Sequence, residues 1–271
     1  MTSGTGADDA GPGQLRREPP RFRRARVART ERRSGRMVRV TLAGPELEGL
    51  DPGLPGASVR LLLPSPGVDG PVLELPEWNG NEFLRADGTR PVIRTLTPLR
   101  VGTDPPELDV EVVVHGDGPL SRWAEHAEPG DEVAVSGTGR GYDVDPAAGS
   151  FLIVGDESAL PAISTLLPAL PAEADVRVLA GVQDASGRLE LPDHPRAQVT
   201  WCEPAPGGTV GEALLDAVSG LDLPDDVRVW AAGEAAAVQA LRKHLFEVRG
   251  LPRSHCVVRG YWKQGRAGPG T

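Results

Sequence analysis

The stretch from Arg94 to Arg100 carries a guanidinium and a hydroxyl at a fixed spacing along one extended segment. Side chains two residues apart lie on the same face of a strand, which places Arg94 with Leu96. Thr95 and Thr97 lie on the other face. The planar guanidinium of Arg94 suits the oxygens of a pyrophosphate, and the Thr97 hydroxyl suits a heteroatom of a ring lying along the strand. A surface arginine and an ordinary strand threonine are the alternative interpretation of this stretch.

A second group of anion-binding atoms is predicted where a helix begins. The run HGDGPLS, from His115 to Ser121, stands directly before a helical stretch over residues 120–128. The first N–H groups of a helix have no partner within it, and the helix dipole favours negative charge there. The candidates for this phosphate cradle are Gly118, Pro119, Leu120 and Ser121. His115 has no partner for general-base chemistry, so we interpret it as a wall residue of the same site.

A buried strand, a tight turn and a helix start follow one another over residues 151–161, FLIVGDESALP. This order is typical of dinucleotide binding, in which a pyrophosphate lies at the positive end of the helix. The usual G-x-G-x-x-G is absent, and the carboxylates of Asp156 and Glu157 would repel a phosphate. We expect them to accept hydrogen bonds from ribose hydroxyls or from loop amides, with Ser158 as the N-cap of the helix.

Composition limits the classes of function. The chain has 271 residues, enough for two domains, and its formal net charge of -9 disfavours general attraction to nucleic acid or anionic membranes. No apolar run is long enough to span a bilayer and no secretory signal pattern is found, so we expect cytoplasmic residence without membrane insertion. Cys202 and Cys256 lack metal-ligand spacing, so no metal site is predicted.

The arginines crowded between Arg16 and Arg39 leave two interpretations open. They could form an arm that binds nucleic acid, or the solvated outer face of alternating strands, which is the commoner arrangement.

The spacing of apolar residues divides the chain into two parts. Short alternating strands with few helices up to residue 136 predict an antiparallel barrel, and alternating strands and helices from residue 151 predict an α/β domain. We therefore expect a flexible tail over 1–20, a barrel over 21–145, an α/β domain over 150–266 and a tail over 267–271.

Several motifs in this order resemble those of the siderophore-interacting proteins. They are HGDGP at 115–119, GDESALPAI at 155–163, WAAGE at 230–234 and GYWKQGRA at 260–267. The spacing of Arg94 and Thr97 also resembles the Arg-x-Tyr-Ser/Thr signature of ferredoxin-reductase-like flavin barrels. Leu96 stands where that signature has tyrosine, and Leu99 stands where the family often has arginine.

The resemblance implies a two-domain ferredoxin-reductase-like fold, with an N-terminal antiparallel six-stranded β-barrel for FAD and a C-terminal α/β Rossmann-like domain for NAD(P)H. It implies a ferric-siderophore reductase that passes a hydride from NADPH or NADH to FAD and single electrons to chelated Fe(III), releasing Fe(II). The cofactor carries this chemistry, so no acid/base residue is required.

Roles for individual residues follow from the same resemblance. FAD would be held by Arg94, Thr95, Leu96, Thr97, His115, Gly118, Pro119, Leu120, Ser121 and Tyr142, with Thr97 near flavin N5, Tyr142 on the adenine and Trp262 near the flavin. NAD(P)H would be held by Asp156, Glu157, Ser158, Gly233 and Glu234. Lys263 and Arg266 would form a basic rim for an anionic ferric siderophore.

Two other functions stay open at this point. The chain could be a non-catalytic flavin or siderophore-binding protein, or a general flavin reductase or one fed by ferredoxin. The sequence also does not choose between NADPH and NADH. Arg188 could meet a 2′-phosphate, but an ordinary turn arginine is the commoner case.

Overall fold

The structure is a computed structural model and describes residues 21–68 and 70–265. Its N-terminal half is one antiparallel sheet with the strand order β6-β3-β9-β1-β2-β8-β7. The strands are β1 (Phe22–Ser34), β2 (Met37–Ala43), β3 (Val59–Leu62), β6 (Ile93–Leu96), β7 (Pro98–Thr103), β8 (Pro106–Val113) and β9 (Glu132–Ser136).

The two edge strands of this sheet, β6 and β7, are halves of one chain segment that is interrupted only at Thr97. One half pairs with β3 and the other with β8, at opposite ends of the strand order. The segment therefore joins both edges, and the sheet is a barrel of six strands, with β6 and β7 counted as one bent strand. This confirms the predicted antiparallel six-stranded barrel.

The barrel core is formed by the apolar residues that alternate with polar ones along the strands. Val40, Leu42, Leu108, Val110 and Val133 are fully buried in one cluster. Helix α1 (Pro119–His126) lies against this cluster through Leu120 and Trp123. The apolar face of α1 is therefore buried against the apolar inner face of the barrel strands.

The arginines of β1 and β2 pair with carboxylates on neighbouring strands. Arg26 meets Glu132 on β9, Arg29 meets Glu107 on β8, and Arg39 meets Glu111 on β8 at 2.9 Å. This arrangement favours the interpretation of a solvated outer barrel face.

Acid should weaken the ion pairs on the outer face of the barrel, because it protonates the carboxylate of Glu107. Hydrogen bonds from Arg29 and Arg100 lower the pKa of Glu107 from 4.5 to about 2. A carboxylate whose pKa is lower in the folded chain stabilises the fold fully above its unfolded pKa and loses that contribution as pH falls through the folded pKa. We therefore expect Glu107→Gln to lower the melting temperature at pH 6 and to have a smaller effect near pH 2. Glu190→Gln, at an unpaired exposed position within the described chain, is the control. An equal loss at both pH values would contradict this prediction.

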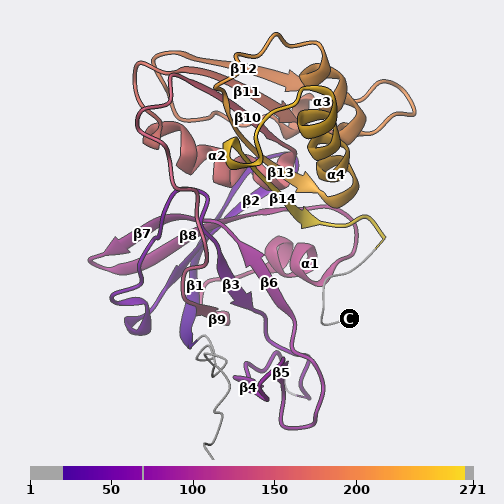
Figure 1. Cartoon of the computed structure of the whole chain (residues 1–271). Helices are drawn as coiled ribbons and strands as arrows, with labels where there is room; N and C mark the ends of the chain where they lie inside the picture. The colour runs from indigo at the N-terminus through magenta and orange to yellow at the C-terminus, as the bar shows by residue number, and fades with distance from the viewer. Residues whose placement is uncertain (1–20, 69, 266–271) are drawn as a thin grey trace, which may run out of the picture.

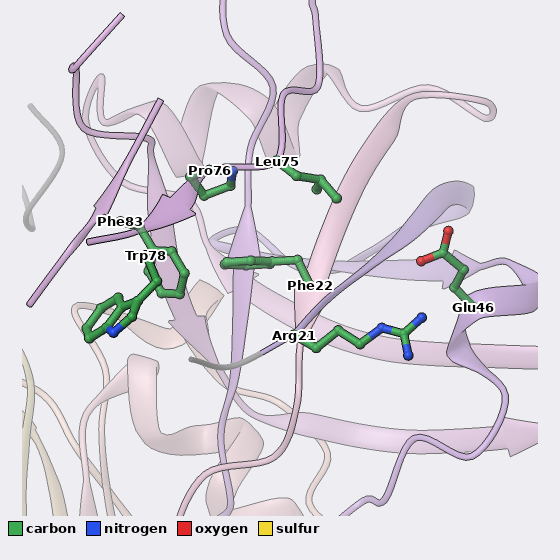
Figure 2. Close-up of a pocket in the computed structure, with 7 residues that line it drawn as sticks. All are labelled: Arg21, Phe22, Glu46, Leu75, Pro76, Trp78 and Phe83. Atoms are coloured by element: carbon green, nitrogen blue, oxygen red, sulfur yellow. The ribbon is translucent and has the colours of Figure 1, made fainter. Parts of the chain in front are cut away.

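The segment between β3 and β6, predicted as an irregular excursion, contains a short hairpin of β4 (Glu77–Trp78) and β5 (Phe83–Leu84). Phe83 packs against Trp78 and edge-on against Phe22 of β1. Figure 2 shows these aromatic rings beside a cavity of about 510 Å³. The hairpin lies on the side of the barrel away from the α/β domain (Figure 1).

The C-terminal half is a parallel sheet with the order β12-β11-β10-β13-β14. Its strands are β10 (Ser150–Gly155), β11 (Asp175–Gly181), β12 (Ala197–Cys202), β13 (Arg228–Glu234) and β14 (Cys256–Trp262), and its helices are α2 (Leu160–Leu166), α3 (Val210–Ser219) and α4 (Ala235–Lys243). The strand order reverses at β10, and such a switch point is where α/β sheets bind ligands. The predicted Rossmann-like domain is confirmed.

Short helical turns complete both halves. They are η1 (Pro45–Leu47), η2 (Glu157–Ala159), η3 (Leu167–Ala169), η4 (Ala185–Gly187), the π-helical η5 (His244–Val248) and η6 (Arg253–His255). The predicted capping box at the start of α3 is present, because Thr209 and Glu212 accept hydrogen bonds from each other's backbone N–H groups.

The two halves share one core. Met37 from the barrel and Tyr142 from the connection lie in the same buried cluster as Trp230 of β13. The turn between β1 and β2 also reaches the α/β domain, because Arg36 pairs with Glu157 at 2.9 Å. These contacts fix how the barrel faces the switch point. Within the described chain, every helix is too short or too polar to cross a membrane.

Candidate functional site

Arg94, the predicted phosphate-binding cation, lies in β6, three residues before the break between β6 and β7 at Thr97. Its side chain is half-buried and donates one hydrogen bond, to the carbonyl of Ile93 at 2.9 Å. Among residues 21–68 and 70–265 no carboxylate lies within ion-pair distance of it. Burial lowers the pKa of this guanidinium. A half-buried cation without an acidic partner in the described chain suits an anionic ligand.

Strand pairing places Arg94 beside strand β3, whose inward residues belong to the barrel core. Arg94 stands opposite Leu61 and Leu96 stands opposite Val59, and both partners belong to the barrel core. Leu120, at the start of α1, packs against the same core. The strand that carries Arg94 and the helix start therefore share one barrel core, through Leu96 and Leu120.

The start of α1 has the free donors that the sequence predicts. Gly118 is the N-cap and makes no side-chain cap, and Pro119 follows it. Within the described chain the N–H groups of Leu120 and Ser121 make no hydrogen bond. The Ser121 hydroxyl instead braces the preceding loop, accepting from His115 N–H at 3.2 Å and donating to the His115 carbonyl at 3.0 Å. Two backbone donors at a positive helix end remain for an anion.

His115 lies at the boundary between the domains, and Thr97 is buried where β6 and β7 meet. Thr97 is only 6% exposed, and its hydroxyl has no hydrogen-bond partner among the residues described. Thr95 is exposed, whereas Leu96 is half-buried and packs on the barrel core. The His115 ring lies 5.8 Å from the ring of Trp262, which ends β14 of the other domain. The structure thus brings His115 and Trp262 together, which sequence spacing did not predict.

The turn after β10 is organised by Asp156. Asp156, not Ser158, is the N-cap of η2, and this corrects the predicted cap. Its carboxylate accepts hydrogen bonds from the N–H groups of Ser158 and Glu234 at 2.9 and 2.8 Å. Of the two partners expected for this carboxylate, the structure shows loop amides. Burial raises the pKa of Asp156, and these donors act against that shift.

The other carboxylates of this region also have partners within the chain. Glu157 accepts from Arg36 at 2.9 Å. Glu234 caps α4 by accepting from Ala236 and Ala237, and its second oxygen accepts from the N–H of Gln264. Burial opposes its ionisation, but these N–H donors hold the pKa of Glu234 below its ordinary value. Gly233, with φ of +150°, lies directly against the Asp156 carboxylate.

Four further residues considered from the sequence remain. Tyr142 is 6% exposed in the core between the domains, and burial raises its pKa to about 12. Little of its ring is open to an adenine, so we leave it out of the proposed cofactor set. Arg188 pairs with Glu203 at 2.7 Å. Lys263 is exposed after β14, and Arg266 lies outside the described residues.

The cavity in Figure 2 is not formed by any of the predicted site residues; Phe22, Trp78 and Phe83 supply its aromatic wall. Sequence reasoning also missed the Arg36–Glu157 ion pair between the domains. The only local signal for it was an arginine among the short strands predicted before residue 136.

Comparison with protein families places both halves of the chain. Residues 26–141 match the siderophore-interacting FAD-binding domain, and residues 148–265 match the siderophore-interacting protein domain. Arg94, the first N–H groups of α1 and the Thr97 hydroxyl, all without a partner in the part of the chain that the structure describes, fit a flavin nucleotide, with its anionic pyrophosphate and polar ring edge.

Comparison with individual proteins gives the same family and fold. The crystal structure of a siderophore utilization protein from T. fusca is 35% identical, with a TM-score of 0.79 over 92% of this chain and 95% of that one. The ferric vibriobactin reductase ViuB of Vibrio cholerae is 28% identical over 86% of both chains. The ferredoxin reductase of carbazole 1,9a-dioxygenase, at 14% identity, covers 91% of this chain and 71% of that one, and its TM-score of 0.66 confirms the ferredoxin-reductase-like fold. The chain therefore belongs to the siderophore-interacting protein family.

Proposed function

We propose that this protein is an FAD-dependent ferric-siderophore reductase that takes its electrons from NADPH or NADH. The observation that carries this proposal is the half-buried Arg94 guanidinium, which has no carboxylate partner in the described chain. The first N–H groups of α1 and the Thr97 hydroxyl, which also make no hydrogen bond among the described residues, support it. The similarity to a ferric vibriobactin reductase supports the choice of a ferric chelate as substrate. We keep 21–145 and 150–266 as the proposed domain limits.

In this proposal each group has one task. Arg94 and the N–H groups of Leu120 and Ser121 neutralise and orient the pyrophosphate from two sides. Thr97 offers a hydroxyl to the edge of the ring system near N5. When bound, FAD would supply the conversion of a two-electron hydride into single electrons for Fe(III). The chain's contribution is to hold and orient the reactants and to exclude water at the domain boundary.

The nicotinamide nucleotide is proposed to bind at the switch point beside β10. Asp156, Glu157 and Glu234 are occupied by partners within the chain, so they shape this site and leave direct contacts to backbone groups around residues 155–158 and 233–234. The absence of a glycine-rich loop and the Arg188–Glu203 pair give no preference between NADPH and NADH.

The purified full chain tests this proposal. We expect it to be yellow, and we expect NADPH or NADH with a ferric chelate and a ferrous trap to yield Fe(II) faster than free flavin does. Chelate binding without turnover would support a non-catalytic binding protein instead. Flavin that is bleached rapidly by reduced ferredoxin and slowly by both nicotinamides would support a ferredoxin-fed reductase.

A basic rim is proposed for the ferric siderophore, because many such chelates are anionic and the protein as a whole is acidic. Lys263 follows Trp262 directly at the carboxyl end of β14, and Arg266 is three residues further along. We expect Lys263→Ala with Arg266→Ala to raise KM for an anionic chelate several-fold while leaving flavin bleaching by NAD(P)H unchanged.

Lys243→Ala is the matched control, since it removes the only other lysine of the chain, at the end of α4. Equal changes in bleaching and in KM for the chelate, or a KM that is independent of ionic strength, would rule out the basic rim.

A further inference from the structure

The end of β14 contains an irregularity that re-aims two aromatic side chains. Gly260 pairs with Gly233 of β13, but Glu234 pairs with Trp262, so Tyr261 is the extra residue of a bulge. Bulges redirect neighbouring side chains and are frequent beside active sites. Here Tyr261 packs edge-on against Trp230 at 6.3 Å, and Trp262 reaches His115 of the barrel domain at 5.8 Å.

The indole of Trp262 is held by a carboxylate from the turn after β10. Its Nε1–H donates to Asp156 Oδ2 at 2.8 Å, and the same oxygen accepts from Glu234 N–H at 2.8 Å. The other oxygen of Asp156 accepts from both the N–H and the hydroxyl of Ser158, at 2.9 and 2.5 Å. All four donors belong to the chain itself. A ribose hydroxyl could reach this carboxylate only by displacing one of them.

Burying the carboxylate of Asp156 costs free energy that its hydrogen-bond donors must offset. Asp156 is only 8% exposed, and a buried charge destabilises a protein unless donors surround it. Trp262, by contrast, is 39% exposed, so burial alone does not fix its rotamer. A hydrogen bond from a neutral N–H to an ionised acceptor is stronger than one between neutral groups. The carboxylate therefore decides the orientation of the half-exposed indole.

We infer that Asp156 is a positioning residue that holds the Trp262 indole against His115 across the domain boundary. The two rings stand where the barrel and α/β domains meet, which is where the nicotinamide ring would approach the flavin. This inference rests on the proposed function and replaces the predicted contact between Asp156 and a nucleotide ribose. Asp156 acts through Trp262, on the domain opposite Arg94 and α1, so it governs reduction of the flavin and spares FAD affinity.

The first test needs neither cofactor nor activity. The full chain is labelled with 5-fluorotryptophan, and Trp262→Phe assigns the Trp262 signal among the five tryptophans by fluorine NMR. Asp156→Asn should shift and broaden that signal more than those of Trp78, Trp123 and Trp201. An unchanged Trp262 signal would overturn the positioning role, whatever the reaction of the protein.

The second test uses the FAD-loaded chain and stopped-flow bleaching with NADPH and NADH. Loss of a hydrogen bond to a charged group should slow flavin reduction by about 10-fold in Trp262→Phe and in Asp156→Asn, with the Kd for FAD unchanged. The double variant should be no slower than either single variant, because both remove the same contact. The inference would be overturned if the rate loss in the double variant equalled the product of the two single losses, or if any of these variants bound FAD more weakly.

Tyr261→Phe is the matched control for these variants. It alters the neighbouring residue of the same bulge, and the Tyr261 hydroxyl makes no hydrogen bond among the described residues, so we expect a bleaching rate like that of the unmodified chain. Should Asp156→Asn not fold, Trp262→Phe, at an exposed position, still decides the kinetic question. If the unmodified chain itself is not bleached by nicotinamides, the proposed function fails while the NMR result still decides whether Asp156 positions Trp262.

Discussion

Arg94→Ala is expected to release FAD from the protein, so that the variant leaves a gel-filtration column colourless while the unmodified chain stays yellow. The half-buried guanidinium has no acidic partner in the described chain, so its removal leaves the pyrophosphate with only the α1 N–H donors. A charge-assisted hydrogen bond of this kind contributes about 1.5–3 kcal/mol, which corresponds to about 10- to 100-fold weaker binding. Titration of the apo-protein with FAD, followed by flavin fluorescence, measures the change.

Two further variants separate the phosphate contact from general charge. Arg94→Lys keeps the charge and loses the planar fork, so it should bind FAD with intermediate affinity. Arg60→Ala removes an exposed arginine from the neighbouring strand, opposite Thr95, and should bind FAD normally. FAD binding that is equally weak in Arg60→Ala and Arg94→Ala would show that the effect comes from barrel stability or net charge.

Gly233→Ala is expected to have the largest effect on stability in the α/β domain. A Cβ at this position would lie 2.6 Å from Asp156 Oδ2 and 2.8 Å from its Cγ, in a backbone conformation with φ of +150° that side chains disfavour. The carboxylate cannot retreat, because four donors hold it. Overlap in a packed site costs about 1–3 kcal/mol, and the backbone strain adds to it. The expected result is a melting temperature lower by several degrees, measured by circular dichroism.

Gly250→Ala provides the comparison for Gly233→Ala. Gly250 also has a positive φ, +69°, but a Cβ there would meet nothing within 4 Å. It therefore reports the cost of a side chain at a left-handed φ without any steric overlap. If the two variants lose the same stability, the contact with Asp156 is not what requires glycine at position 233.

Much of the fold could be predicted because it depends on patterns of neighbouring residues in the sequence. Alternation of apolar residues in Met37–Ala43 and Pro106–Val113, and the buried run before Gly155, were sufficient to distinguish an antiparallel barrel from a parallel α/β sheet. The capping box of α3 was equally local, since its two partners stand three residues apart. Ser158 was assigned as a cap for the same kind of reason, and Asp156 took that position because it also meets groups far away in the chain.

The sequence by itself determined the types of element, the face of β6 that carries Arg94, the free helix start at Gly118 and the family motifs. Each of these depends on residues within a few positions of one another, where backbone geometry fixes which side chains share a face. Only the tertiary structure decided what Asp156, Glu157 and Trp262 do. Asp156 meets donors 78 and 106 residues away, and Glu157 meets Arg36 at a separation of 121 residues. Contacts of that range arise from how strands pair and how two domains pack, and no local periodicity encodes them.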